Sequence, residues 1–282
     1  MVTQQQANSD LQINPHRLSP KFIGVVHLPA LPGDVHQTYS IQECYDFALR
    51  DAEALLEGGV EGIIIENFGS APFQKGSLAD PAPPHQLAAL TVVAHQIRTL
   101  TSTVKIGINC LRNDAVAALG IASAVQADFI RVNVLSGAYV TDQGLIEGEA
   151  ARVLRYRKQL GAEHIKIFAD ILVKHASPLA PLSAEQAALD TWKRGGADVL
   201  IVSGTGTGAP VNPDLLKQVQ TTVQGQVPIY LGSGLTLDNV DRLAPLASGA
   251  IVGTALKEDG VLNAPVSIQR VKDLKKALQK HW

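Results

Sequence analysis

Eight short apolar runs recur along the 282 residues of this chain, and a segment of helical character follows each of them. The runs are rich in Val, Ile and Leu and do not alternate with polar residues, which is typical of parallel strands buried on both faces. Alternation of strand and helix predicts an α/β fold. The predicted strands are Phe22–Leu28, Gly62–Glu66, Val104–Cys110, Phe129–Asn133, His164–Asp170, Val199–Val202, Pro228–Leu231 and Gly249–Lys257.

The number of strand and helix units favours a closed sheet. No Gly-x-Gly-x-x-Gly follows the first strand, which argues against an open dinucleotide-binding sheet. Because nothing in the composition resembles an interdomain linker, we predict a single (β/α)8 barrel of the TIM type over residues 21–282, preceded by a flexible N-terminal arm over residues 1–20. The predicted helices are Ile41–Glu57, His85–Leu100, an Ala-rich helix after Asp114, Glu147–Leu160, Ser183–Arg194, Asn212–Gln220, a short helix at Leu237 capped by Thr236, and Pro265–Lys280.

Composition and charge exclude several functional classes. The formal net charge of −2 offers no basic field for nucleic acid, so we expect no nucleic-acid partner. Cys44 and Cys110 lack CxxC spacing and indicate a reducing compartment. The first residues lack the basic and apolar regions of a signal peptide, and no apolar stretch reaches the roughly 20 residues that cross a bilayer. We therefore expect no signal peptide and no transmembrane segment, so that any membrane association is peripheral.

Two glycine turns near the C-terminus predict an anion site. Gly232–Gly234 follows a predicted strand and precedes a predicted helix with Asp238 in its first turn, an arrangement that presents free backbone N–H groups. In barrels of this type, the loops after the seventh and eighth strands commonly bind phosphate. The alternative is that these glycines serve only the geometry of the turns. The predicted phosphate-binding residues are Ser203, Gly204, Gly232, Ser233, Gly234, Gly253 and Thr254.

Polar residues accumulate where the predicted strands end. Because the C-terminal ends of barrel strands form one rim, these side chains are expected to converge there. Buried polar groups are costly unless they are paired, so the alternative to a functional site is a set of mutual hydrogen bonds that plugs the barrel. The catalytic candidates are His27, Glu66, Asp170, Lys174 and His175, and the substrate-contacting candidates are Asn67, Asn109, Arg112, Arg131 and Asn133.

The chemistry of individual candidates leaves alternatives open. His27 is a general base or a core histidine that supports the proline loop after the first strand. Glu66 ends a run of isoleucines and is a general acid or base, or else a salt-bridge partner of Arg131 or Arg112. Asp170 is followed closely by Lys174 and His175, which together offer acid, base and imidazole on one loop.

Three further interpretations receive less support from the residues. A metal held by His27, Glu66, Asp170 and His175 has suitable ligand types, but no local motif such as HExxH supports it, so we predict no metal and no cofactor. Lys166 is either a Schiff-base lysine or, as the favoured alternative, a lysine near the foot of the barrel that pairs outward. The basic face of Pro265–Lys280 is solvated or contacts anionic lipid headgroups.

The run Gly24–Gly33, with the sequence GVVHLPALPG, closely resembles the N-terminal signature of the BtpA family. The resemblance extends over about residues 20–280. It includes one departure, because Ser70 stands where the family pattern has Asp. The other matching tracts are Glu66–Phe68 with Ala71–Phe73, Asn109–Asp114, Arg131–Asn133 with Ser136-Gly137, Asp142–Gly144 with Glu147-Gly148, Ala169-Asp170 with Lys174–Ala176, and Leu231–Gly234.

This resemblance implies a TIM-type barrel and a choice between two functions. In oxygenic phototrophs the family is linked to photosystem I biogenesis, which implies a peripheral protein on the cytoplasmic face of the thylakoid membrane. Its partners would be photosystem I reaction-centre proteins or the thylakoid surface. Other relatives resemble sugar-phosphate or nucleoside enzymes, which implies general acid/base chemistry on a phosphorylated small molecule. Whether the chain is an enzyme stays open at this point, and we also expect a homo-oligomer.

Overall fold

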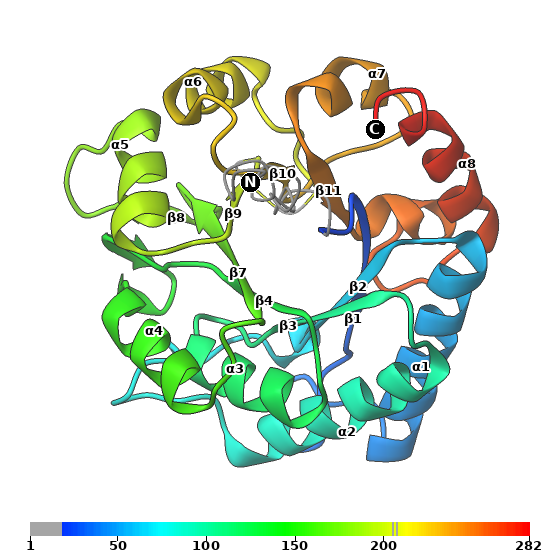
Figure 1. Cartoon of the computed structure of the whole chain (residues 1–282). Helices are drawn as coiled ribbons and strands as arrows, with labels where there is room; N and C mark the ends of the chain where they lie inside the picture. The colour runs from blue at the N-terminus through cyan, green and yellow to red at the C-terminus, as the bar shows by residue number, and fades with distance from the viewer. Residues whose placement is uncertain (1–18, 205, 207) are drawn as a thin grey trace, which may run out of the picture.

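The computed structural model describes residues 19–282 except residues 205 and 207, so most of the predicted N-terminal arm lies outside the described residues. The core is a closed parallel barrel of eight strands, which confirms the predicted fold class (Figure 1). The strands follow one another around the barrel in chain order. They are β1 (Phe22–His27), β2 (Gly62–Glu66), β3 (Lys105–Asn109), β4 (Phe129–Val132), β7 (Lys166–Ile171), β9 (Val199–Val202), β10 (Ile229–Leu231) and β11 (Gly249–Val252).

Helices surround the barrel on its outside (Figure 1). The first of them shows why the chain forms helices where it does, because Ser40 and Glu43 form a reciprocal capping box and Gly59 ends the helix at φ +88°. The helices are α1 (Ile41–Gly58), α2 (Pro84–Leu100), α3 (Ala115–Ala124), α4 (Ala150–Gln159), α5 (Ala184–Leu189) continued by a π-helical turn (Asp190–Arg194), α6 (Pro213–Val223), α7 (Val240–Leu243) and α8 (Ile268–Leu278).

The inside of the barrel is apolar in its lower part. Phe129 stacks on Phe168 there with ring centroids 4.5 Å apart, and Phe168 makes an edge-to-face contact with Tyr230 at 5.3 Å. Side chains alternate between the two faces of a strand. The residue two positions after each of these apolar side chains therefore also points into the barrel. That next layer is polar or glycine and lies at the C-terminal ends of the strands. It contains His27, Glu66, Asn109, Arg131, Asp170, Ser203, Gly232 and Gly253.

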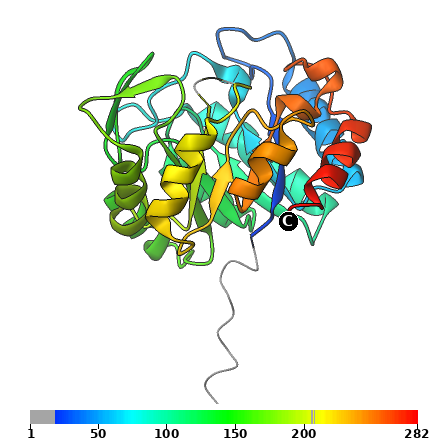
Figure 2. The same ribbon diagram turned by 90° about the horizontal axis from the view of Figure 1, so that it is seen from above.

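A small antiparallel sheet covers part of this end of the barrel and corrects the predicted long loop after β4. It consists of β5 (Ala138–Thr141), β6 (Gly144–Glu147) and β8 (Ala176–Pro178). Figure 2 shows the hairpin in green beside the other loops that follow barrel strands. Tyr139 and Ile146 are buried and Gly144 adopts φ +90° in the turn. Because Gly144–Glu147 forms a strand, α4 begins at Ala150 and not at the predicted Glu147.

The helix after β10 also differs from the prediction. It begins at Val240 and has only four residues, so neither Thr236 nor Asp238 lies at a helix N-terminus. The side chain of Asn239 explains the delay. Its Oδ1 accepts from the Thr236 N–H at 2.9 Å and its Nδ2 donates to the Gly234 carbonyl at 2.8 Å, and such local bonds compete with helix formation.

The last barrel strand is shorter than the predicted Gly249–Lys257. It ends at Val252, and Lys257 is fully buried where its Nζ pairs with Asp51 of α1. Lys166 lies at the start of β7, half-exposed, and pairs outward with Asp198 at 3.1 Å, as the favoured interpretation predicted. Within the part of the chain that the structure describes, no helix combines the length and apolar character needed to cross a membrane.

Candidate functional site

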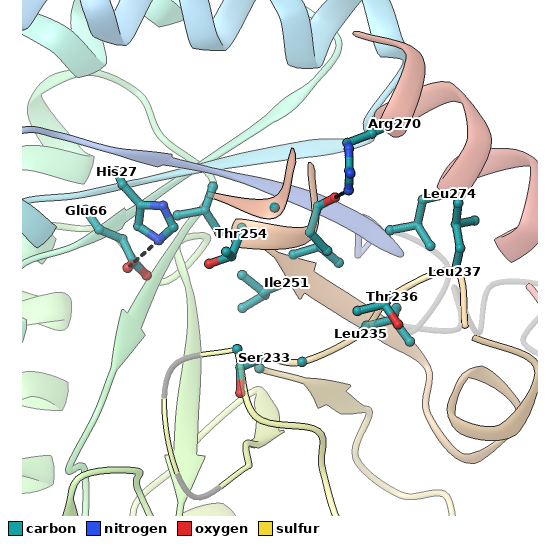
Figure 3. A pocket seen from close by; sticks show the side chains of 18 of the residues that line it. His27, Glu66, Ser233, Leu235, Thr236, Leu237, Ile251, Thr254, Arg270 and Leu274 are labelled. Carbon is teal, nitrogen blue, oxygen red and sulfur yellow. Dashed lines mark hydrogen bonds and ion pairs between the residues drawn. The ribbon is translucent and has the colours of Figure 1, made fainter. Parts of the chain in front are cut away.

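A cavity of about 600 Å³ opens at the C-terminal end of the barrel, within the range of roughly 300–1,000 Å³ that holds small molecules. Figure 3 shows His27 and Glu66 at one end of it, Thr254 in the middle, and Arg270 and Leu274 of α8 at the other end. Its wall includes backbone from the two glycine turns after β10 and β11. Of the residues that the sequence placed at the strand ends, some line this cavity, namely His27, Glu66, Arg131, Lys174, Gly232, Ser233, Gly234, Gly253 and Thr254.

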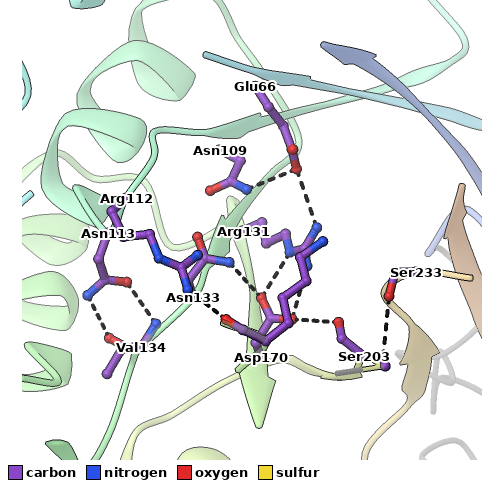
Figure 4. Close-up of polar contacts among 12 residues, drawn as sticks. Glu66, Asn109, Arg112, Asn113, Arg131, Asn133, Val134, Asp170, Ser203 and Ser233 are labelled. Atoms are coloured by element: carbon purple, nitrogen blue, oxygen red, sulfur yellow. Dashed lines mark hydrogen bonds and ion pairs between the residues drawn. The ribbon is translucent and has the colours of Figure 1, made fainter. Parts of the chain in front are cut away.

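Arg131 lies at the centre of the polar layer (Figure 4). Its Nε and Nη2 donate to the two Asp170 carboxylate oxygens at 2.9 Å and 3.0 Å, and its Nη1 donates to Glu66 Oε1 at 3.3 Å. All three residues are buried. Burial disfavours the guanidinium charge, but Asp170 and Glu66 hold the pKa of Arg131 above its usual range. This cluster is both a plug for the barrel and the floor of the cavity.

Asp170 and Glu66 differ in how many of their carboxylate oxygens accept hydrogen bonds from neighbouring side chains. Asp170 also accepts from Asn133 Nδ2 at 3.0 Å and Ser203 Oγ at 3.1 Å, so both of its oxygens are occupied. Glu66 uses Oε1 to accept from Arg131 and from Asn109 Nδ2 at 2.9 Å. Its Oε2 instead faces His27 Nε2 at 3.9 Å. Asp170 is thus placed to hold Arg131, whereas Glu66 keeps one oxygen for a ligand.

The facing atoms of His27 and Glu66 are placed so that one ligand atom can reach both from the side of the cavity. At 3.9 Å the two side chains are too far apart for a direct hydrogen bond, whereas a hydroxyl group beside them can bond to both. His27 also packs against Phe68, with ring centroids 4.8 Å apart, and its buried Nδ1 has no hydrogen-bond partner among the described residues. The imidazole is therefore held in place by packing, and Nε2 is the nitrogen that faces Glu66.

Burial and neighbouring charges determine the protonation states of this pair. Burial lowers the pKa of His27 to about 4, an effect that the Glu66 carboxylate offsets only in part. Burial works to raise the pKa of Glu66, but Arg131, His27 and Asn109 together hold it below its ordinary value. Near neutral pH the site therefore contains a carboxylate beside a neutral imidazole.

Glycines let the backbone approach the polar layer closely. A Cβ at Gly253 would lie 2.5 Å from His27 Cε1, and a Cβ at Gly232 would lie 2.4 Å from Ser203 Oγ. Gly234 adopts φ +71°, which favours glycine, and a Cβ there would lie 2.1 Å from the Ala209 carbonyl oxygen. These residues are consequently required by the shape of the site, whatever the site binds.

The seven predicted phosphate-binding residues divide into two groups. Gly232, Ser233, Gly234, Gly253 and Thr254 line the cavity. Ser203 instead donates to Asp170, and the N–H of Gly204 donates to Ser233 Oγ at 3.3 Å. Ser203 and Gly204 therefore support the layer from behind. Because α7 is short and starts late, backbone groups of the turns, and not a helix N-terminus, face the cavity.

The predicted substrate-contacting residues are mostly supports as well. Arg131 lines the cavity, while Asn109 and Asn133 bond to the two carboxylates. Asn67 anchors the loop after β3 through the backbone of Leu111, at 2.7 Å and 3.1 Å. Arg112 Nη2 donates to the Lys174 carbonyl at 2.8 Å.

The structure separates Lys174 from His175. Lys174 lines the cavity, whereas His175 is exposed and lies near the loop after β9. Ser70, the position that departs from the family pattern, is buried in the turn Phe68–Ser70 and does not line the cavity. Among residues 19–282, with 205 and 207 aside, no cluster of three or more His, Cys, Asp or Glu side chains is arranged to hold a metal ion.

Sequence reasoning missed the outer half of the cavity. Leu235 and Leu237 come from the loop after β10, and Arg270 and Leu274 come from α8. Arg270 Nη1 bonds to the Ala255 carbonyl at 3.3 Å, which holds α8 against the turn after β11. The basic face of this helix was visible in the sequence, but its approach to the barrel mouth depends on how α8 packs.

The comparisons with known proteins agree with this architecture. The model of the BtpA family matches residues 19–280. The photosystem I biogenesis protein BtpA of Synechocystis sp. is 45% identical over 249 residues, which cover 88% of this chain and 84% of that protein. The uncharacterized protein TK2179 of Thermococcus kodakarensis is 46% identical over 253 residues, which cover 90% of this chain and 93% of that protein.

Solved structures share the fold at low sequence identity. Thiamine phosphate pyrophosphorylase from Pyrococcus furiosus superposes with a TM-score of 0.56 at 16% identity and covers 92% of this chain and 96% of its own. Phosphoribosyl anthranilate isomerase from Thermus thermophilus gives 0.53 at 14% identity, with coverages of 92% and 98%. These likenesses support the barrel alone. By the family model and by the identity of its relatives, the chain belongs to the BtpA family.

Proposed function

We propose that the cavity binds a phosphorylated small molecule and that His27 and Glu66 carry out general acid/base chemistry on it. The observation that carries this proposal is the arrangement of one cavity, with glycine-turn backbone on one wall and the His27–Glu66 pair at its inner end. Backbone N–H groups in such turns bind phosphate oxygens. The phosphate would anchor the ligand and leave its reactive part beside the pair.

The protonation states suggest a division of labour. Glu66 is the ionised group with a free oxygen, so it accepts a proton from the ligand. His27 is neutral and donates a hydrogen bond to a ligand oxygen without adding a positive charge. Arg131 and Asp170 hold Glu66 in place from below. The names of two structural neighbours contain a phosphate or phosphoribosyl group, which is compatible with this use of the fold but carries no weight for the reaction.

A phosphate ester should raise the melting temperature of the wild-type protein and should not raise that of Thr254→Asp. A ligand at one hundred times its Kd adds about 2.7 kcal/mol to stability, and a carboxylate at Thr254 would repel the phosphate. The measurement is a thermal-shift screen of sugar phosphates and inorganic phosphate. Thr221→Asp, on the outer surface of α6, is the matched control and should respond like the wild type. A screen without any stabilising phosphate compound would contradict the proposal.

We infer a second role, photosystem I biogenesis from the cytoplasmic face of the thylakoid membrane, from a separate observation. The chain is 45% identical to the photosystem I biogenesis protein of Synechocystis. In addition, several of the large exposed apolar side chains lie on the loops that follow the barrel strands. They include Val35 and Leu78, which are 75% and 74% exposed, together with Val140, Leu179, Leu237 and Val261.

These loops all lie at one end of the barrel, the upper side in Figure 2. Apolar side chains exposed at one end support a contact there with a membrane or a partner, because removing apolar area from water is favourable. We propose that this end contacts the thylakoid surface, where photosystem I reaction-centre proteins are the partners. The basic residues of α8 are partly committed to contacts within the chain, such as Lys272 with Glu57 at 3.3 Å, so they contribute less.

Complementation tests this role. In a Synechocystis strain that lacks its own BtpA, the wild-type chain should restore photosystem I content and fractionate with membranes. A Val35→Asp, Leu78→Asp double variant should do neither, because it places charge on the apolar end. Val92→Asp, on the flank of the barrel in α2, is the control. Failure of the wild-type chain to restore photosystem I would overturn this role, and a change from oligomer to monomer in the double variant would assign the surface to a second copy.

A further inference from the structure

Lys174 lines the cavity and has no ion-pair partner among the residues that the structure describes. It follows β7 and lines the cavity together with Glu66 and Arg131. Within the described part of the chain, both carboxylates of the polar layer are paired with Arg131, and no carboxylate lies within 4.0 Å of the Lys174 Nζ. Two other lysines show the usual outcome, because Lys257 pairs with Asp51 and Lys166 pairs with Asp198.

The backbone around Lys174 is held in an unusual conformation. Leu172 and His175, on either side of it, adopt φ values of 48° and 56°. Such conformations cost a non-glycine residue about 1–3 kcal/mol and are concentrated at functional sites. The hydrogen bond from Arg112 Nη2 to the Lys174 carbonyl, at 2.8 Å, ties this segment to the loop after β3. The structure thus uses strain and a buried arginine to present this lysine at the mouth of the barrel.

The surroundings of Lys174 make its ammonium group easier to deprotonate than that of an exposed lysine. Burial and the Arg131 guanidinium lower the pKa of Lys174, while Glu66 and Asp170 act in the opposite direction. A desolvated lysine beside another cation is the usual arrangement for an amine that attacks a carbonyl group. Lys166, which the sequence alone offered as a Schiff-base candidate, is excluded by its outward pairing with Asp198.

We propose that Lys174 forms an imine with the carbonyl group of the phosphorylated ligand, so that the ligand is an aldehyde or ketone phosphate ester. This inference rests on the proposed phosphate-binding function of the same cavity. One proton passes from the lysine ammonium to Glu66 through water in the open cavity. The freed nitrogen pair then attacks the carbonyl carbon, and the carbonyl oxygen receives a second nitrogen proton to become a hydroxyl. Protonated Glu66 returns its proton as that hydroxyl leaves, which yields water and a protonated imine.

Reductive trapping tests this inference. The wild-type protein is treated with limiting pyridoxal 5′-phosphate, or with glyceraldehyde 3-phosphate, and with sodium cyanoborohydride, and the modified lysines are located by peptide mass spectrometry. We expect Lys174 to be modified several-fold faster than any other lysine, and inorganic phosphate to slow this reaction by competing for the glycine turns. Lys174→Arg and Lys174→Gln should lose the fast adduct, whereas Lys166→Arg should retain it.

The outcomes separate the two proposals. Equal modification of Lys174 and the surface lysines, in a protein that phosphate still stabilises against heat, overturns the imine and leaves phosphate binding intact. Fast modification of Lys174 that phosphate does not slow, in a protein that no phosphate compound stabilises, overturns the phosphate site and supports the reactive lysine. A fast adduct that persists in both folded Lys174 variants overturns the assignment to this residue.

Discussion

Replacing Arg131 by Met should lower the free energy of unfolding by about 3–5 kcal/mol, the range found when one partner of a buried ion pair is removed. The reason is that Arg131 bonds to both Asp170 and Glu66, and all three side chains are almost completely buried. Without the guanidinium, two carboxylates remain in the barrel with only amide and hydroxyl donors. Urea unfolding followed by circular dichroism at pH 7 measures the change.

Lys166→Met is the control, because it also removes a positive charge but from an exposed ion pair. Lys166 pairs with Asp198 at 3.1 Å while its side chain is half-exposed, and exposed pairs contribute only about 0–1 kcal/mol. Arg131→Lys keeps the charge but not the two parallel hydrogen bonds to Asp170, so its stability should lie between the wild type and Arg131→Met. If Arg131→Met were as stable as Lys166→Met, the central role of Arg131 in the layer would be wrong.

We also expect His27 to make the free energy of unfolding depend strongly on pH. Its pKa is about 4 in the folded chain, against an ordinary value of 6.5 that applies when the chain is unfolded. Between these two values the unfolded chain binds a proton on this imidazole and the folded chain does not. The free energy of unfolding therefore falls as the pH falls from 6.5 to 4, by about 3 kcal/mol in total.

Comparison of variants isolates this contribution, because ionised carboxylates such as Glu66 also lose stabilising contacts in acid. His27→Gln should show a smaller fall in stability between pH 6.5 and 4 than the wild type. His164→Gln, which removes an exposed imidazole, is the control and should follow the wild-type curve. Denaturant titrations at several pH values supply the data, and a His27→Gln curve parallel to that of the wild type would refute the assignment.

Much of the fold could be predicted because it depends on local patterns. Continuous apolar runs such as Gly62–Glu66 are unstable outside a sheet covered on both faces, and eight of them with intervening helices leave few topologies. The inward polar layer follows from the same pattern, because Glu66 and Arg131 come two residues after the inward-facing Ile64 and Phe129. Parity along a strand is a property of the backbone and needs no tertiary information.

Other features depend on contacts between distant segments. The hairpin Ala138–Glu147 has alternating residues and a Gly turn that resemble a strand signal, but its pairing with Ala176–Pro178 was not visible in the sequence. The start of α7 depends on the side chain of Asn239, which bonds to two nearby backbone groups. The hairpin was missed because its third strand comes from a distant segment, and the helix start was wrong because local side-chain hydrogen bonds compete with the helix.

The sequence by itself determined the eight strands, the end of the barrel where polar residues collect, and the family to which the chain belongs. Only the tertiary structure decided which of these polar residues have all their hydrogen-bonding atoms occupied by neighbouring side chains. Asp170 and Glu66 both end a barrel strand, yet Arg131 and its neighbours occupy both oxygens of Asp170 and only one of Glu66. Likewise Lys166, Lys174 and Lys257 look alike in the sequence, and only Lys174 faces the cavity. The physical reason is that the partner of a charged side chain is chosen by its neighbours in space, which the closed barrel brings from every part of the chain.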